Sequence, residues 1–164
     1  MKNQNQTKLN RLSFIFATLL LTTGLFGQTA TAPSGSGTET DPYLIATLDN
    51  LYWMTQNAGE WGAGKYYEQT ADIDASTSSS WNVGDHDNDN STPDSAVGFS
   101  NISFSGTYDG GSHTIDQLTI YRPHSSSYYA GFFGSTNNAT IKDLGLTNVD
   151  ITGYYFVGAL SGTD

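Results

Sequence analysis

The spacing of hydrophobic residues changes once along the chain. Between Leu48 and Ala58 apolar residues recur at helical spacing. Thr47 stands where it can cap the first turn, and Asp49 follows where the helix dipole favours an anion. Gly59 suits a left-handed stop. The pattern predicts a helix of about residues 47–58, which we expect to cover one end of a core.

After Gly59 apolar and polar residues alternate, which is typical of half-buried strands. The first strand is expected from Lys65 to about Ile73, and further short runs follow, each bounded by Gly, Asn, Asp or Ser. In "FSGTYDGGSHTIDQLTI", residues 104–120, the segment Asp109-Gly110-Gly111 is expected to be a tight corner between two strands, because glycine adopts positive φ without strain.

Two stretches of the chain repeat one another. "TIDQLTI…YYAGFFG" and "TIKDLGL…YYFVGALSG" match at a nearly constant offset, which places Ile115 over Ile141 and Leu118 over Leu144. A fixed period of about 20–50 residues indicates a repeat architecture. Units of short strands and glycine turns predict an all-β fold, a parallel, right-handed β-helix or solenoid with a short N-terminal capping helix.

Several stretches together resemble bacterial secreted proteins that carry the GLUG repeat, which is named for a Gly-Leu-x-Gly signature. They include "GSGTETDPYLIATLDNLYWM", "YYEQTADIDAS", "ATIKDLGLTNVDITG" and "VGALSG". The resemblance covers most of residues 35–162, with GLUG-like repeats at about 104–164. The signature sites read "GFFG" (131–134) and "GALSG" (158–162), so phenylalanine replaces leucine in the first, which a hydrophobic interior should tolerate.

The resemblance implies a β-helix-like fold and an extracellular role. GLUG repeats occur in large surface proteins, in adhesin-like proteins and beside some IgA-protease regions. The resemblance implies no set of catalytic residues, and none is carried over to this chain.

The first residues carry an export pattern. A basic stretch, an apolar run and small residues predict a secretory signal peptide of residues 1–27, with cleavage possible as late as residue 32. Residues 28–40 are then expected to form a flexible leader, and residues 41–164 the start of the solenoid. We expect a secreted or surface protein of bacterial type without a membrane span in the mature chain.

Charge and composition exclude several classes of protein. Six basic residues face sixteen acidic ones, for a formal net charge of −10. A nucleic-acid surface needs a basic stripe, which this chain lacks, and an anionic membrane surface is disfavoured for the same reason. The chain has no cysteine, so disulfides and thiolate sites are excluded.

One acidic loop is a candidate calcium site. Asp85, Asp87 and Asp89 alternate as the first oxygen ligands of an EF-hand loop do. The rest of that pattern is missing, because Asn90 stands in place of the glycine and Ala96 in place of the glutamate. The alternative is a solvated acidic loop. No other cofactor is expected.

Two tyrosine pairs are candidate binding residues. Tyr128-Tyr129 and Tyr154-Tyr155 could form aromatic ladders, and strand alternation predicts that one member of each pair points outward. Outward tyrosines could stack on sugar rings, since an aromatic face is a flat apolar platform with a polar tip. The alternative is that they serve packing alone.

Other polar residues give weaker signals. His86, His113 and His124 have no metal-ligand spacing. Asp116 and Asp143 are separated by close to one repeat, so they could stack as a carboxylate pair of the kind that cleaves glycosides. Repetition explains them without catalysis.

These observations favour a non-catalytic secreted or cell-surface module that acts in adhesion or in binding a glycan or protein. One alternative is the N-terminal segment of a larger extracellular carbohydrate-active enzyme or protease with its chemistry downstream. Another is an inert spacer. Because the sequence stops just after a repeat signature, we expect it to be incomplete at its C-terminal end.

Overall fold

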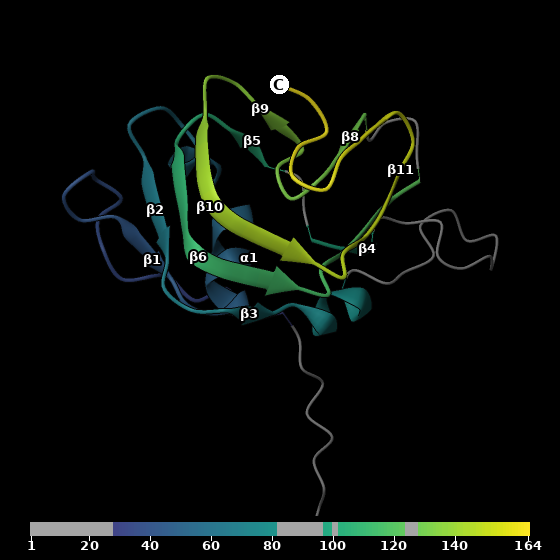
Figure 1. Cartoon of the computed structure of the whole chain (residues 1–164), viewed down its shortest axis with the longest axis horizontal. Helices are drawn as coiled ribbons and strands as arrows, with labels where there is room; N and C mark the ends of the chain where they lie inside the picture. Colours follow the sequence, from purple (N-terminus) through teal and green to yellow (C-terminus); the bar gives the residue numbers. More distant parts are fainter. Residues whose placement is uncertain (1–27, 82–96, 100–101, 124–127) are drawn as a thin grey trace, which may run out of the picture.

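The computed structural model describes residues 28–81, 97–99, 102–123 and 128–164. The predicted signal peptide and the candidate calcium loop, with Asp85, Asp87 and Asp89, lie outside the described residues. Strands dominate the described part of the chain, and it contains one α-helix (Figure 1). No helix among these residues is long and apolar enough to cross a membrane.

The helical elements lie before residue 81, and most of the strands follow them. The helices are α1 (Leu48–Gln56) and the 3₁₀ helices η1 (Ala58–Glu60) and η2 (Ser76–Ser80). The strands are β1 (Tyr43–Ile45), β2 (Tyr66–Gln69), β3 (Ile73–Asp74), β4 (Val97–Gly98), β5 (Ser103–Phe104), β6 (Thr107–Asp116), β7 (Thr119–Arg122), β8 (Tyr129–Ala130), β9 (Ser135–Thr136), β10 (Thr140–Thr147), β11 (Asp150–Gly153) and β12 (Phe156–Val157).

The helix α1 starts where the sequence predicts. The backbone N–H of Asn50 donates to Thr47 Oγ1 at 3.2 Å, and the Thr47 N–H donates to Asn50 Oδ1 at 3.2 Å, which completes a capping box. Leu51 and Met54 are fully buried, so this helix packs on the core.

The helix ends earlier than predicted, at Gln56, and Gly59 lies inside η1, so the left-handed stop at Gly59 is wrong. Side chains bond the last carbonyls instead. Asn57 Nδ2 donates to the Trp53 carbonyl and Trp61 Nε1 donates to the Met54 carbonyl, both at 2.7 Å. A glycine cap is therefore not needed to satisfy this end of the helix.

The strands pair almost entirely in parallel. The largest sheet has the order β1-β2-β6-β10, with β3 also paired to β6 (Figure 1). The strands β7, β8 and β5 pair in parallel with β11, β12 and β9, and β4 with β7 is the antiparallel pair among the described strands. The strands β6, β7 and β8 thus pair in turn with β10, β11 and β12 of the following segment. The prediction of an all-β chain with parallel pairing is confirmed.

The register differs from the predicted one. Ile115 pairs with Leu146, and Ile141 pairs with Tyr108, so the predicted stack of Ile115 over Ile141 is wrong. Leu118 does not pair with Leu144 either, because its carbonyl accepts the Asp150 N–H at 2.9 Å. The partners along β7 and β11 are further apart in sequence than the repeat predicts.

A bulge in β6 changes the register. Asp109 pairs with Lys142 whereas His113 pairs with Leu144, so β6 has two more residues than β10 between these pairs. The segment Asp109-Gly110-Gly111 is therefore not a corner between two strands, because β6 runs through it. Gly111 has a φ of +58°, the positive value that glycine accommodates there.

Aromatic side chains stack inside the core. Tyr67 stacks on Tyr108 at 6.2 Å between ring centroids, and Phe104 stacks on Phe133 at 4.6 Å. All four are at most 1% exposed. We call these four residues the inner aromatic stack.

The two glycine signatures lie side by side. In "GFFG" the N–H groups of Phe132 and Phe133 donate to the Ala159 and Leu160 carbonyls of "GALSG", at 3.1 and 2.8 Å. Both phenylalanines are fully buried, as expected for a substitution in a hydrophobic interior. A Cβ at Gly131 would lie 2.8 Å from the Gly158 carbonyl oxygen, so the close approach of the two backbones requires glycine.

Candidate binding surface

Five exposed aromatic residues gather on β8 and on the segment that leads into β12. We call this group the outer aromatic patch, and its members are Tyr128, Tyr129, Tyr154, Tyr155 and Phe156. Their exposed fractions run from 38% to 54%. Contiguous exposed apolar surface of this kind marks interaction sites in soluble proteins.

The patch is built as two stacked pairs. The Tyr128 and Tyr155 rings lie 5.1 Å apart with planes at 12°, and Tyr129 and Phe156 lie 5.5 Å apart at 29°. Tyr154 meets Tyr155 edge-on, with centroids 4.5 Å apart. The pairs follow the parallel ladder of β8 and β12, in which Tyr129 and Phe156 are partners. They are therefore aromatic ladders between successive segments.

The expectation that each tyrosine pair points one ring inward is wrong. Tyr128 and Tyr129 are both exposed, as are Tyr154 and Tyr155. Strand alternation governs only residues inside a strand. Tyr128 precedes β8, and Tyr154 and Tyr155 lie in a bend between β11 and β12, so alternation does not apply to them. Within β8 it holds, because Ala130 beside Tyr129 is fully buried.

The sequence analysis did not identify Phe156. The offset that places Ile115 over Ile141 also aligns Tyr129 with Tyr155, whereas the structure pairs Tyr129 with Phe156, one position further along the chain. The glycines carried the correct signal, since Gly131 and Gly158 have the same separation in sequence as Tyr129 and Phe156. Applied to the aromatic residues, the glycine offset identifies both stacked pairs.

The backbone beneath the patch is held by hydrogen bonds. The Phe156 N–H donates to the Tyr128 carbonyl at 2.9 Å, and the Gly158 N–H donates to the Ala130 carbonyl at 3.0 Å. A Cβ at Gly153 would lie 2.7 Å from the Cβ of Ala130, so the segments also pack closely. The rings are thus presented by a fixed backbone, which lowers the entropy that binding would cost.

The chemistry of the patch is apolar with polar tips. Four of its members carry phenolic hydroxyls, and none carries a charge. Aromatic groups with hydroxyl tips can pack against the C–H faces of sugar rings and also bond their hydroxyls.

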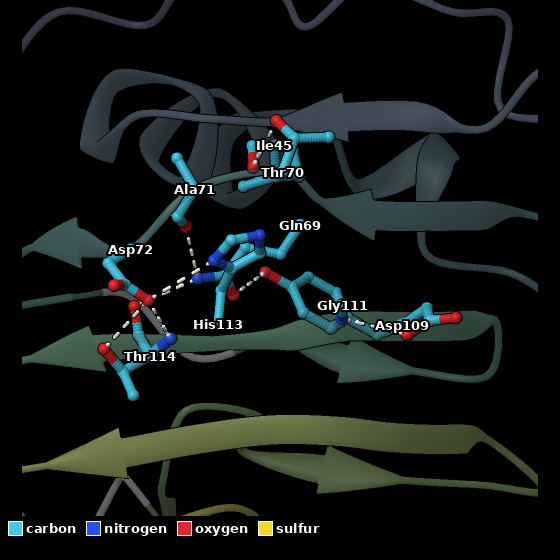
Figure 2. Close-up of polar contacts among 10 residues, drawn as sticks. Ile45, Gln69, Thr70, Ala71, Asp72, Asp109, Gly111, His113 and Thr114 are labelled. Atoms are coloured by element: carbon cyan, nitrogen blue, oxygen red, sulfur yellow. Dashed lines mark hydrogen bonds and ion pairs between the residues drawn. The ribbon is translucent and has the colours of Figure 1, made fainter.

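Apart from the patch, a cluster of polar residues supports the bulge in β6. Gln69, only 1% exposed, donates through Nε2 to the Ala71 carbonyl at 2.8 Å and to the Thr114 carbonyl at 3.0 Å (Figure 2). Its Oε1 accepts the hydroxyl of buried Tyr108 at 3.2 Å. These bonds satisfy buried polar groups of three segments, so the cluster has a structural role.

Asp72 continues this cluster at the surface. Its Oδ1 accepts the Thr114 N–H at 2.8 Å and the Thr114 hydroxyl at 3.2 Å, and His113 Nδ1 lies 3.4 Å away (Figure 2). The Thr114 backbone bond, more than any other contact, holds the pKa of Asp72 below its ordinary value. His113 thus makes a local contact with the Asp72 carboxylate.

No group of three His, Asp or Glu residues that could hold a metal ion occurs within the described ranges. His86 and His124 lie outside them. The calcium loop therefore stays a prediction from the sequence.

The predicted carboxylate pair is not formed. Asp116 pairs in register with Thr147, and Asp143 lies at the bulge, where β10 passes from Lys142 to Leu144. Asp116 Oδ1 accepts the Thr147 hydroxyl and the Asn148 amide, both at 2.7 Å. These bonds, that of Thr147 foremost, lower the pKa of Asp116. The stack of Asp116 over Asp143 that the repeat offset would allow is therefore absent.

A shallow hollow of about 290 Å³ opens over β2 and β6. Its polar lining includes Glu68, Asp109 and Lys142. Lys142 Nζ lies 2.7 Å from Asp109 Oδ2, and this contact is the main cause of the lowered pKa of Asp109. The lysine and the aspartate satisfy each other, so they link β6 to β10 across the sheet surface.

Comparison with known proteins gives one distant relative. Halomucin of the archaeon Haloquadratum walsbyi is 34% identical over 135 residues, which are 80% of this chain and 1% of that protein. The chain thus spans about 1% of the length of this relative. No family model matches the chain, and no solved structure matches it. The GLUG resemblance stays a prediction, and the comparisons do not support a bacterial origin. The similarity to Halomucin is compatible with a role at the cell surface.

Proposed function

We propose that this chain is a non-catalytic module of a secreted or cell-surface protein, and that it binds carbohydrate through the outer aromatic patch. The observation that carries the proposal is the pair of exposed ring stacks, Tyr128 on Tyr155 and Tyr129 on Phe156. Because these rings are exposed, they contribute less hydrophobic stabilisation than buried rings would. A role in binding therefore accounts for them better than a role in folding does.

We further propose that the module is a β-solenoid. Parallel pairing in chain order supports this, since β6, β7 and β8 pair in turn with β10, β11 and β12. In such a fold each added coil extends the ladder, so one coil's binding residues recur on the next. Repetition along a long protein gives multivalent attachment, in which weak sites add up to firm adhesion.

Charge narrows the class of ligand. The chain has a formal net charge of −10, and the patch itself carries no charged side chain. Sulfated or uronic-acid glycans would meet long-range repulsion from this chain. Neutral polysaccharides with exposed C–H faces therefore fit best.

A glycan array tests the proposal. The full chain is compared with a Tyr128→Ala/Tyr155→Ala variant, and Tyr66→Ala on β2 serves as a control outside the patch. We expect binding of neutral glycans, a loss of roughly tenfold or more in the patch variant, and full binding in the control.

Two results would count against it. One is an array without a bound glycan, and the other is equal binding by the patch variant and the full chain. Binding of acidic glycans alone would contradict the charge argument while leaving the patch as the contact surface.

A further inference from the structure

Tyr128 and Tyr155 bring two phenols of successive segments together at the surface. Their rings lie 5.1 Å apart and nearly parallel, and both side chains are 54% exposed. The chain has no cysteine, so disulfides cannot cross-link its segments. We propose that Tyr128 and Tyr155 are a site of oxidative cross-linking, at which a peroxide and a haem peroxidase join the two rings as dityrosine.

Accessibility separates this pair from the buried tyrosines. Tyr67 contacts both Tyr43 and Tyr108, but it is 1% exposed, and Tyr108 is fully buried. An oxidising enzyme cannot reach those rings. Burial also raises the pKa of both Tyr67 and Tyr108, which disfavours loss of the phenolic proton.

Geometry separates the Tyr128–Tyr155 pair from the other exposed tyrosine pairs. Tyr154 meets Tyr155 at 80°, and Tyr128 lies 6.4 Å from Tyr129 with planes at 48°. Both of those pairs are neighbours in sequence, so a bond between them would not connect segments. Tyr128 and Tyr155 flank the paired strands β8 and β12, and a bond between them would lock these strands together.

The chemistry balances with the oxidant named. Each phenol gives up one electron and one proton and becomes a phenoxyl radical. The two radicals form a carbon–carbon bond between one Cε of each ring, the carbon ortho to the oxygen, and the hydrogens on those two carbons then move to the oxygens as the rings regain aromaticity. The peroxide accepts both electrons and both protons and leaves as two water molecules.

A cross-link at this place changes stability. It closes the loop of chain between Tyr128 and Tyr155, which restricts the unfolded chain. We expect the melting temperature to rise by roughly 10 °C. The inference does not depend on glycan binding, because coupling requires only the two phenols and their contact.

The experiment treats the dilute full chain with hydrogen peroxide and a haem peroxidase. Dityrosine fluorescence is measured in the monomer band of a denaturing gel, and the cross-linked peptide is mapped by mass spectrometry. We expect a peptide that joins Tyr128 to Tyr155. Tyr128→Phe and Tyr155→Phe keep the ring stack but remove one phenol, and each should lower monomer fluorescence at least about fivefold. Tyr121→Phe, on β7, should leave it unchanged.

Three results would overturn the proposal. They are an absence of dityrosine, dityrosine found in cross-linked dimers alone, and undiminished monomer fluorescence in Tyr128→Phe. A map that joins Tyr154 to Tyr155 instead would also overturn it, because that bond connects no segments.

Discussion

The inner aromatic stack and the outer aromatic patch are built in the same way but lie in opposite environments. Tyr67 on Tyr108 and Tyr128 on Tyr155 both pair rings from segments joined by parallel strands. The inner rings are at most 1% exposed, whereas those of the patch are 38–54% exposed. Stacking of successive segments therefore produces both buried and exposed aromatic ladders, and only the buried ones belong to the core.

The difference in burial separates stability from recognition. Fully burying a large apolar side chain stabilises a protein by about 1.5–3 kcal/mol. An exposed ring pair keeps mainly its mutual contact, worth about 0.5–1.5 kcal/mol. The inner stack is thus expected to hold the fold, and the outer patch is available to bind a ligand.

The largest effect is expected from the inner stack. Phe104 is fully buried, packs on Phe133 and contacts Tyr67. Phe104→Ala should lower the free energy of unfolding by about 3–5 kcal/mol, because it removes apolar contacts and leaves a cavity. Urea denaturation of the full chain measures this. If Phe104→Ala lowered the free energy of unfolding less than removal of an exposed ring such as Tyr155 does, the comparison would be contradicted.

A smaller effect is expected at the polar centre of the core. Gln69→Leu removes the bonds to the Ala71 and Thr114 carbonyls and leaves the Tyr108 hydroxyl without its acceptor. Buried groups that lose a partner cost about 1–3 kcal/mol. The same denaturation series measures the change. Unchanged stability would show that this cluster does not hold the bulge.

The outer patch should change stability less. Tyr155→Ala removes a ring that is 54% exposed, so we expect a loss of about 0.5–1.5 kcal/mol in the free energy of unfolding. Glycan binding should fall much more in the same variant. If stability dropped as far as in Phe104→Ala, the patch would be part of the core.

The smallest effect concerns pH. The folded state holds the pKa of Asp116 below its ordinary value of 3.8, so it binds protons less readily than the unfolded chain. This contribution is present above pH 3.8 and is lost as the pH falls toward the lower folded pKa. The melting temperature should drop in that window, and less so in Asp116→Asn. An equal drop in melting temperature in the unmodified chain and in Asp116→Asn would contradict this expectation.

The sequence predicted the class of each element better than the partners of each residue. The Thr47 cap and the parallel pairing could be predicted, because capping and repetition are local or periodic signals. The register could not. Two offsets satisfy the hydrophobic pattern equally well. Ile115, Leu118 and Ile120 match Ile141, Leu144 and Leu146 at the shorter offset, and Leu146, Val149 and Ile151 at the longer one.

After the bulge, β6 and β10 pair at the longer of these two offsets, and the bulge depends on contacts that are distant in sequence. Asp72 and Gln69 bond Thr114 from another strand segment, which no local pattern reveals. The candidate site was predicted in part for a similar reason. Its four tyrosines were identified from repetition, but three of them point outward from positions outside any strand, Tyr128 before β8 and Tyr154 and Tyr155 in the bend between β11 and β12.

The central claim is the parallel stacking of successive segments in the observed register, and paired cysteines test it most directly. Thr119 and Asp150 are partners on β7 and β11, and residues paired across neighbouring strands are close enough for a disulfide. In this cysteine-free chain, Thr119→Cys/Asp150→Cys should form a disulfide on mild oxidation. Thr119→Cys/Gly145→Cys, which follows the shorter offset of the sequence repeat, should stay reduced. A disulfide in the second variant and not in the first would contradict the account.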